Sequence, residues 1–257
     1  MRMIYAIDVS AMAYREFGGG RNIETAIVTK ALSLSRRPDA VVYLAFDSRP
    51  TFRDAMFPEY KNRPMTEARQ TVRNAIQVAE MMSRQNGLRV AKADGYEADD
   101  VLASIARGGR VRNEPVSIIS GDRDLIPLLQ FRGVQLFSKI SSIGYDDTVG
   151  RLVQLEGEQT AADVAERYGV SVGQWVDFRC LVGDAGDNIK GVPGVGEKTA
   201  AGILQVFESL DNMFADWSTH REWASDSLAP KLDALKERLP FVRKLFRLAD
   251  DLNVLNH

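Results

Sequence analysis

Apolar runs that end in or lead to an aspartate recur along the first half of the chain. Residues 3–8 form such a run, residues 40–47 form a second, and residues 115–120 lead into Asp122. Short continuous apolar runs are typical of strands that are buried on both faces, as in a parallel sheet. We predict five strands, at residues 3–8, 40–47, 88–91, 115–120 and 134–137.

Segments with helical spacing alternate with these strands. Thr66 followed by Glu67 is a typical helix start, and Gly87 is a typical helix end. We predict helices at residues 11–17, 23–35, 66–85, 101–106 and 125–130. Strands that alternate with helices indicate an α/β fold with a mostly parallel central sheet and helices on both faces.

After about residue 150 the strand pattern fades. Helices are expected at residues 160–168, 172–182 and 197–207, and residues 241–252 are amphipathic, with Leu248 and Leu252 among the expected core residues. A glycine-rich loop at 183–196 precedes the third of these helices. We therefore expect a catalytic α/β domain at residues 1–150 and a helical subdomain at residues 151–257.

Carboxylates gather where the predicted strands end. Asp8, Asp47, Asp122 and Asp124 follow three strands, and residues 95–100 follow a fourth with Glu97, Asp99 and Asp100 in succession. An acid-rich first helical turn explains the last group alone, because it complements the helix dipole. However, ligands of parallel sheets bind beyond the carboxyl ends of the strands. Crowded carboxylates repel unless a cation or protons lie among them, so this convergence predicts a site for a hard cation such as Mg²⁺.

The amino-acid composition argues against several other kinds of active site and metal site. Among 257 residues there is one cysteine, Cys180, and there are two histidines, His220 and His257. An intramolecular disulfide and a cysteine-cluster metal site are therefore excluded, and a histidine base is not expected. No apolar run suggests a signal peptide or a membrane span, so a reducing cytoplasm is the expected location and no membrane partner is expected. Ser10, Ser48 and Ser120 have no base available and are interpreted as local hydrogen-bonding residues.

Taken together, the motifs resemble the 5′-nuclease family of phage flap endonucleases, 5′→3′ exonucleases and bacterial DNA polymerase nuclease domains. The matching stretches follow the family's order at residues 7–8, 45–47, 57–63, 95–100, 120–124 and 181–201. Val9 departs from the family, in which many members have glycine. The resemblance implies a PIN-like fold with a helical arch at about residues 49–73. It also implies a helix–three-turn–helix in the C-terminal subdomain.

The resemblance also implies two divalent ions, Mg²⁺ or Mn²⁺, in one active site. The residues expected around the first ion are Asp8, Asp47, Glu97, Asp99, Asp100 and Asp122. Those expected around the second ion are Asp124, Asp184 and Asp187. We expect the helix to begin within residues 95–100, and Asp100 to act through water near the second ion, so that its replacement is the mildest. Two ions about 3.5–4 Å apart suit phosphodiester hydrolysis by water.

The basic and glycine-rich motifs have candidate roles in DNA binding. By resemblance, Lys61 and Arg63 contact the scissile phosphate, although a solvated helix face is the alternative for each. Tyr60 would stack on an unpaired base, although an isolated aromatic is more often a core residue. The remaining candidate DNA contacts are Arg53, Lys190, Gly191, Val192, Gly194, Val195, Gly196 and Lys198. The glycine-rich loop would also hold K⁺, and a plain helix–helix turn is its structural alternative.

The charge distribution agrees with a nucleic-acid partner. The chain carries 33 basic and 35 acidic residues, for a net charge of −2. Without the nine proposed metal-site acids it would carry +7, which favours binding to a phosphate backbone. We predict a Mg²⁺-dependent structure-specific 5′-nuclease that acts on 5′ flaps and 5′ ends of duplex DNA, and on RNA–DNA hybrids. A DNA polymerase would act in trans. The alternatives are a non-catalytic DNA-junction-binding protein and a PIN-like ribonuclease.

Overall fold

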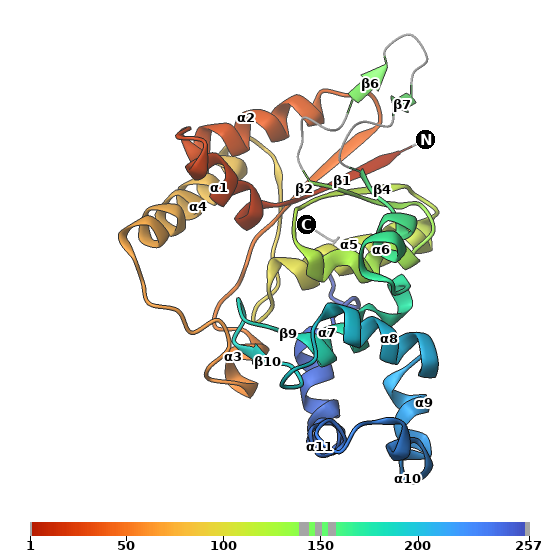
Figure 1. Cartoon of the computed structure of the whole chain (residues 1–257). Helices are drawn as coiled ribbons and strands as arrows, with labels where there is room; N and C mark the ends of the chain where they lie inside the picture. The colour runs from red at the N-terminus through yellow and green to blue at the C-terminus, as the bar shows by residue number, and fades with distance from the viewer. Residues whose placement is uncertain (1, 139–143, 147–150, 154–157, 255–257) are drawn as a thin grey trace. The chain divides into compact units, whose positions relative to one another are not determined.

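The computed structural model describes residues 2–138, 144–146, 151–153 and 158–254 (Figure 1). The chain forms two compact units, and neither is continuous in sequence. The first comprises Met1–Ala55, Arg63–Thr160 and Leu248–His257, and the second comprises Met56–Asn62 and Ala161–Arg247. The expected domain boundary at residue 150 lies outside the described residues and stays a prediction.

The first unit is built on a six-stranded sheet. Its strands are β1 (Met3–Asp8), β2 (Ala40–Ala45), β3 (Arg89–Ala91), β4 (Val116–Ile119), β5 (Val134–Phe137) and β8 (Glu158–Gln159). Their order is β3-β2-β1-β4-β5-β8. The first five strands are parallel, and only β8 pairs antiparallel, with β5. The predicted mostly parallel sheet is therefore confirmed.

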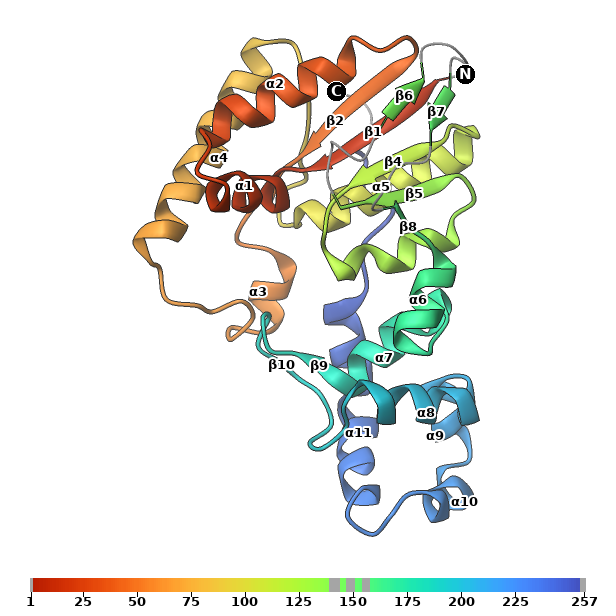
Figure 2. The same ribbon diagram turned by 45° about the horizontal axis from the view of Figure 1, so that its top comes forward.

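Helices cover both faces of this sheet (Figures 1 and 2). Helices α1 (Val9–Gly18), α2 (Ile23–Ser35) and α4 (Glu67–Gln85) pack on one face, and α5 (Ala98–Arg112) and the 3₁₀ helix η1 (Arg123–Gln130) pack on the other. Successive side chains of a strand point to opposite faces. Accordingly, Tyr5 and Ile7 lie in the core cluster with α1, α2 and α4, whereas Ile4 and Ala6 lie in the cluster with α5.

Some short elements of the first unit differ from the prediction. Residues 123–130 form a 3₁₀ helix with Pro127 inside it, which begins two residues before the helix predicted at 125–130. A small hairpin of β6 (Gly144–Asp146) and β7 (Arg151–Val153) was not predicted. Strands this short are too brief to show a clear period in the sequence.

The second unit is mostly helical. Its elements are α6 (Ala161–Tyr168), η3 (Val172–Gln174), α7 (Trp175–Val182), β9 (Gly183–Asp184), β10 (Ile189–Lys190), α8 (Glu197–Phe207), α9 (Leu210–Ala215), α10 (Trp217–His220), η4 (Arg221–Trp223) and α11 (Ala229–Phe246). The ring of the buried Trp175 lies 4.9 Å from Tyr168 and 5.2 Å from Phe178, between centroids. These aromatic residues form part of the core that holds α6 and α7 together.

The end of the chain corrects one expectation. Helix α11 stops at Phe246, so residues 241–252 are not one amphipathic helix. The chain from Leu248 onward belongs to the first unit, where Leu248 and Leu252 pack against the core cluster around α5. They are core residues, as predicted, but in a segment that belongs to no helix or strand.

The segment expected to form a helical arch is helical only near its ends. Helix α3 spans Phe52–Met56, and α4 begins at Glu67 after Thr66, whose side chain accepts a hydrogen bond from the Arg69 amide. The intervening residues 57–66 contain no helix. Across the described ranges, no helix has the length and apolar character needed to cross a membrane.

Candidate metal centre and nucleic-acid interface

Three carboxylates of the first unit lie at one edge of its sheet. Asp8 is the last residue of β1, Asp47 follows β2, and Asp122 follows β4. Strand β1 lies between β2 and β4, and all three are parallel. The carboxyl ends of the strands therefore bring the three side chains to the same edge, as the sequence predicted.

Hydroxyl and amide groups orient two of these carboxylates. The Ser120 hydroxyl donates to Oδ2 of Asp8 at 2.6 Å, and the Ala11 amide donates to Oδ1 at 2.9 Å. The Ser10 hydroxyl donates to Oδ2 of Asp47 at 2.7 Å. The Ser120 oxygen also accepts locally, from the Asp122 amide at 3.1 Å. Both serines, however, bond carboxylates that are distant in sequence, which the interpretation of local hydrogen bonding did not include. Their role follows from strand pairing, which places different strand ends side by side.

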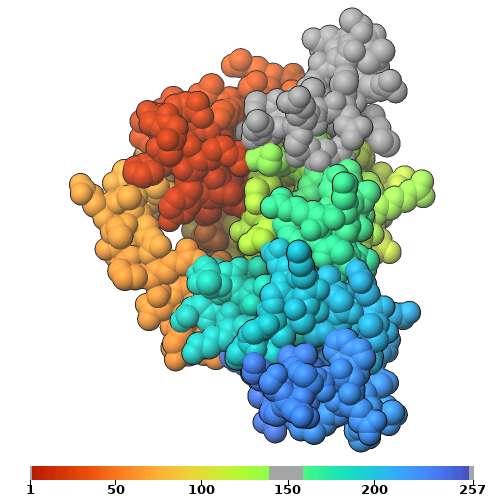
Figure 3. Space-filling model, in the orientation of Figure 1, coloured from red at the N-terminus to blue at the C-terminus, as the bar shows by residue number. Residues whose placement is uncertain are grey.

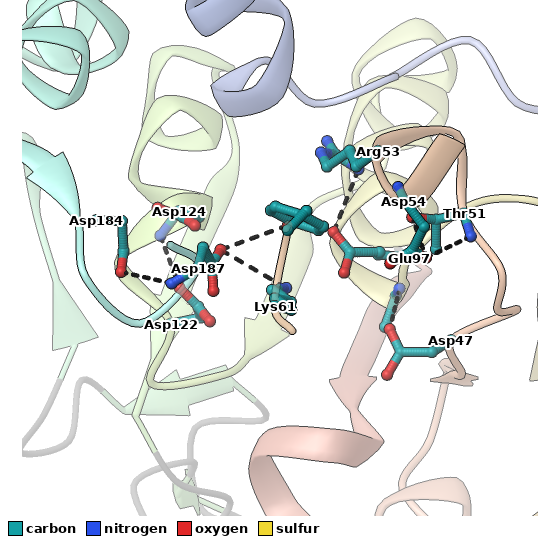
Figure 4. Close-up of polar contacts among 12 residues, drawn as sticks. Asp47, Thr51, Arg53, Asp54, Lys61, Glu97, Asp122, Asp124, Asp184 and Asp187 are labelled. Carbon is teal, nitrogen blue, oxygen red and sulfur yellow. Dashed lines mark hydrogen bonds and ion pairs between the residues drawn. The ribbon is translucent and has the colours of Figure 1, made fainter. Parts of the chain in front are cut away.

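The second bond to Asp47 links it to the acidic stretch. The Ala98 amide donates to Oδ1 of Asp47 at 2.9 Å (Figure 4). Ala98 is the first residue of α5, so Asp47 accepts from an N–H group that has no partner within the helix. The end of β2 and the start of α5 are thereby held together.

The environment of Asp8 disfavours its charged form. Burial raises its pKa, the bonds from Ala11 and Ser120 oppose the rise, and the negative charges of Asp47 and Asp122 add to it. The resulting pKa is about 6, against an ordinary value of 3.8. A carboxyl group with this pKa binds a proton readily. A nearby cation would likewise stabilise its charged form.

Glu97 lies at the start of α5 and is buried. It is the N-cap residue, so the helix begins at Ala98, within the acidic stretch, as predicted. Its carboxylate lies near two guanidinium groups: Nη1 of Arg53 is 3.3 Å from Oε2, and Nη2 of Arg49 is 3.5 Å from Oε1. Figure 4 shows Arg53 directed toward Glu97. Asp99, the next acidic residue, is half-buried.

Asp100 lies in a different setting from the one predicted. It is fully buried, and its carboxylate pairs with both terminal nitrogens of Arg53, at 2.6 and 2.9 Å. It also accepts from the amides of Glu97 at 3.1 Å and Ala249 at 2.9 Å. A carboxylate engaged in this way is not arranged to act through water, which corrects the expectation for Asp100.

Two predicted DNA contacts are also buried. Arg53 is 2% exposed and Tyr60 is 4% exposed. The Arg53 guanidinium is engaged by Asp100 and Glu97, so it is not positioned to meet a DNA strand. The Tyr60 hydroxyl donates to Oδ2 of Asp187 at 3.4 Å, and its burial favours the core alternative over stacking on a base. The spacing of basic and aromatic residues in the sequence did not reveal these buried partners.

The second unit holds the other acidic pair, Asp184 and Asp187. Asp184 belongs to the short hairpin of β9 and β10, and its Oδ1 accepts from the Asp187 amide at 3.1 Å (Figure 4). Its carboxylate also pairs with Arg179 of α7. Burial would raise the pKa of Asp184, but the Arg179 guanidinium together with the amides of Asp187 and Gly186 holds the pKa below its ordinary value. Asp184 is therefore ionised at neutral pH.

Lys61 lies beside Asp187 in the same unit. Its Nζ is 3.8 Å from Oδ2 of Asp187, and its amide donates to the Asp187 carbonyl at 3.2 Å (Figure 4). Lys61 has a φ of 47°, a conformation that is uncommon for a side-chain-bearing residue. Arg63 belongs to the first unit and is exposed.

The glycine-rich loop contains a very close approach of two backbone segments. A Cβ atom on Gly191 would lie 2.3 Å from the carbonyl of Val182, and Gly183 has a φ of 79°. The Val192 amide donates to the Leu181 carbonyl at 2.7 Å. One nitrogen of Arg238 on α11 donates to the carbonyls of Lys190 and Gly191, each at 2.9 Å. This loop is more constrained than a plain helix–helix turn requires.

The predicted loop contacts differ in exposure. Lys190, Gly194, Gly196 and Lys198 are exposed, Gly191 is half-buried, and the side chains of Val192 and Val195 are buried. Any DNA contact by the two valines would therefore come from their backbone groups. The predicted second metal site combines Asp124 of the first unit with Asp184 and Asp187 of the second, and it stays a prediction.

Comparisons with known proteins cover almost the whole chain. The model of the 5′–3′ exonuclease N-terminal resolvase-like domain matches residues 3–169, and that of the 5′–3′ exonuclease C-terminal SAM fold matches residues 170–256. Among solved structures, the zinc-bound 5′-exonuclease of T5 has a TM-score of 0.73 and 21% sequence identity, over 96% of this chain and 90% of that chain. At this level of identity, the similarity shows a shared fold.

Two curated relatives are also similar along most of the chain. The thermostable DNA polymerase I of Thermus thermophilus is 32% identical over 97% of this chain, which spans only 29% of that polymerase. A 5′–3′ exonuclease of Mycoplasma pneumoniae is 30% identical over 81% of this chain and 69% of its own length. With the two family models, these matches show that the chain belongs to the 5′–3′ exonuclease family.

Proposed function

We propose that this protein is a divalent-metal-dependent, structure-specific 5′-nuclease. Its substrates would be 5′ flaps and 5′ ends of duplex DNA, and also RNA–DNA hybrids. The observation that carries the proposal is the convergence of Asp8, Asp47 and Asp122 at one sheet edge, where the pKa of Asp8 is raised to about 6. A cation that neutralises such a cluster relieves the repulsion between its carboxylates and so stabilises it.

The donor set of the first unit fits a hard cation. Its candidate ligand atoms are carboxylate oxygens, which suit Mg²⁺ or Mn²⁺. Asp8, Asp47 and Asp122 would hold the first ion, together with Glu97 and Asp99. When bound, the ion would lower the pKa of a coordinated water and stabilise the charge that develops at the phosphate.

A second ion would involve Asp124, Asp184 and Asp187. The lowered pKa of Asp184 supports this, because a ligand must be ionised before it binds a metal. In this structure, Nζ of Lys61 lies 3.8 Å from Oδ2 of Asp187 and balances part of its charge. We expect the ammonium group of Lys61 to turn toward the scissile phosphate when substrate binds, with Arg63 as the second basic contact.

Duplex DNA would bind to the glycine-rich loop of the second unit. Its tight backbone, with Gly191 against Val182, supports close approach of the loop amides to a phosphate. Lys190 and Lys198 would add positive charge, and a K⁺ ion would bind to loop carbonyls.

The relatives suggest the biological setting. Because several of them are DNA polymerase I proteins, we infer a role in DNA replication and repair. A DNA polymerase acting on the same DNA would be the partner, in the cytoplasm.

The test uses a 5′-labelled flap duplex with Mg²⁺ for the wild type and for Asp122→Ala. We expect the wild type to cleave near the flap junction and to leave a 5′-phosphate, and we expect EDTA or the substitution to abolish cleavage. Equal cleavage by the variant would refute the proposal. Tight binding without turnover under any divalent ion would indicate a junction-binding protein, and faster cleavage of single-stranded RNA than of flap DNA would indicate a ribonuclease.

A further inference from the structure

The carboxylate of Asp100 has no lone pair left for a metal ion. A carboxylate offers about four acceptor positions, two on each oxygen. Oδ1 accepts from Nη2 of Arg53 and from the Ala249 amide, both at 2.9 Å. Oδ2 accepts from Nη1 of Arg53 at 2.6 Å and from the Glu97 amide at 3.1 Å. With all four positions used, the bonds of Asp100 go to protein groups.

These bonds fix Glu97 from two directions. The Glu97 amide donates to Asp100, which sets the backbone at the start of α5. The Arg53 guanidinium, held by Asp100 in a bidentate pair, places Nη1 at 3.3 Å from the Glu97 carboxylate. A planar guanidinium bound at both nitrogens has little freedom to rotate. Asp100 therefore determines where both the backbone and the carboxylate of Glu97 lie.

The end of the chain completes the enclosure of Asp100. Beyond the bond from the Ala249 amide, the Leu252 amide donates to the Ser104 hydroxyl oxygen at 3.1 Å. Ser104 lies one helical turn after Asp100, and its Oγ is 2.9 Å from the Asp100 carbonyl. Leu248 and Leu252 pack against the core cluster, and Val254 is buried. The segment 248–254 is thus attached to α5 at the turn that carries the acidic stretch.

We propose that Asp100 is a positioning residue and that the C-terminal segment 248–254 is part of the metal centre's support. Asp100 holds Glu97 through Arg53 and through the helix start, and the segment holds Asp100. The inference rests on the proposed function, since it assigns Glu97 to a divalent ion. It also implies that any protein or sequence that displaces segment 248–254 would weaken metal binding.

The test measures Mn²⁺ affinity by titration calorimetry on the 257-residue chain, together with the Mg²⁺ concentration for half-maximal cleavage. Asp100→Asn keeps the shape of the side chain and removes its charge. Ser104→Ala removes one hydroxyl and keeps a residue favoured in helices. Asp226→Asn is the control, because it also removes one carboxylate charge but lies at an exposed position of the second unit, outside segment 248–254.

We expect Asp100→Asn to raise the Kd for Mn²⁺ by about 10- to 100-fold, as is typical when a group that supports a metal ligand is lost. Ser104→Ala should raise it several-fold, and Asp226→Asn should leave it unchanged. High Mg²⁺ should restore most of the turnover of both variants. If Asp100→Asn does not fold, the Kd of the Ser104→Ala variant for Mn²⁺ tests the proposal instead.

Lowered melting temperatures with an unchanged Kd for Mn²⁺ would show that Asp100 and Ser104 have a purely structural role, and would overturn the inference. By contrast, if the wild type itself neither binds Mn²⁺ nor cleaves the flap, the proposed function fails instead. The two failures are therefore distinguishable in one set of measurements.

Discussion

The hydroxyl group of Ser120 donates a 2.6 Å hydrogen bond to Oδ2 of Asp8. The two residues are 112 positions apart, and the pairing of β1 with β4 brings them together. The bond stabilises the charged form of Asp8 against burial and against the negative charges around it.

Ser120→Ala should therefore raise the pKa of Asp8 further. More of the protein would then carry a proton at Asp8 at pH 6–7, and metal binding would have to displace it. We expect the Kd for Mn²⁺ to rise about tenfold at pH 6.5, with a smaller rise at pH 8. Ser35→Ala is the matched control, because its hydroxyl bonds only the Ala31 carbonyl near the end of α2. A pH-independent effect would contradict the explanation.

Asp8→Asn should stabilise the metal-free protein while it abolishes cleavage. The folded pKa of about 6 lies above the ordinary 3.8, so the favourable contribution of protonated Asp8 is complete below pH 3.8 and is lost as the pH rises through 6. The difference corresponds to at most about 3 kcal/mol. We expect the variant to melt at a higher temperature than the wild type at pH 8 without metal, and this advantage to shrink toward pH 4.

The charge of Asp8 can also be tested in the wild type, by measuring its melting temperature with and without Mg²⁺. It should raise the melting temperature at pH 8 more than at pH 5, because the ion offsets a charge that is present only at the higher pH. Asp226→Asn, at an exposed position of the second unit, is the control and should respond to Mg²⁺ as the wild type does. A wild-type melting temperature that does not depend on Mg²⁺ at either pH would argue against a cation among these carboxylates.

Lys61→Ala should lower turnover far more than DNA binding. The ammonium group is expected to stabilise charge that develops on the phosphate in the transition state, and loss of one such group costs about 10²- to 10³-fold in turnover. Single-turnover cleavage and filter binding on the same flap substrate separate the two effects. Lys92→Ala, which breaks a 3.0 Å pair with Glu80, should change neither. Weakened binding with unchanged turnover would assign Lys61 to affinity instead.

Two glycine substitutions should act in opposite directions. Gly191→Ala would place a Cβ 2.3 Å from the Val182 carbonyl, and we expect a loss of about 3 kcal/mol in the free energy of unfolding, with weaker duplex binding. Gly202→Ala, inside α8 with no atom within 4 Å of the added Cβ, should gain about 1 kcal/mol. Denaturant unfolding and duplex binding would measure both. Equal stability of the two variants would show that the close approach has no energetic consequence.

The sequence by itself determined the five parallel strands of the sheet, most helices and the acidic set. Apolar runs ending in aspartate predicted β1, β2 and β4, and parallel pairing then required Asp8, Asp47 and Asp122 to share one edge. The acidic stretch also predicted that α5 begins within it, because residues two apart do not share a helix face. These properties depend on local periodicity and on one rule of sheet topology.

Tertiary structure alone decided which charged groups face each other. Arg53 looked like a DNA contact and Asp100 like a peripheral ligand, yet they form a buried pair that segment 248–254 encloses. Sequence spacing cannot show this, because the partners lie 47 and 149 residues apart. A carboxylate is available to a cation only if hydrogen-bond donors do not already occupy its oxygens. Which donors surround it is determined only when the chain is packed.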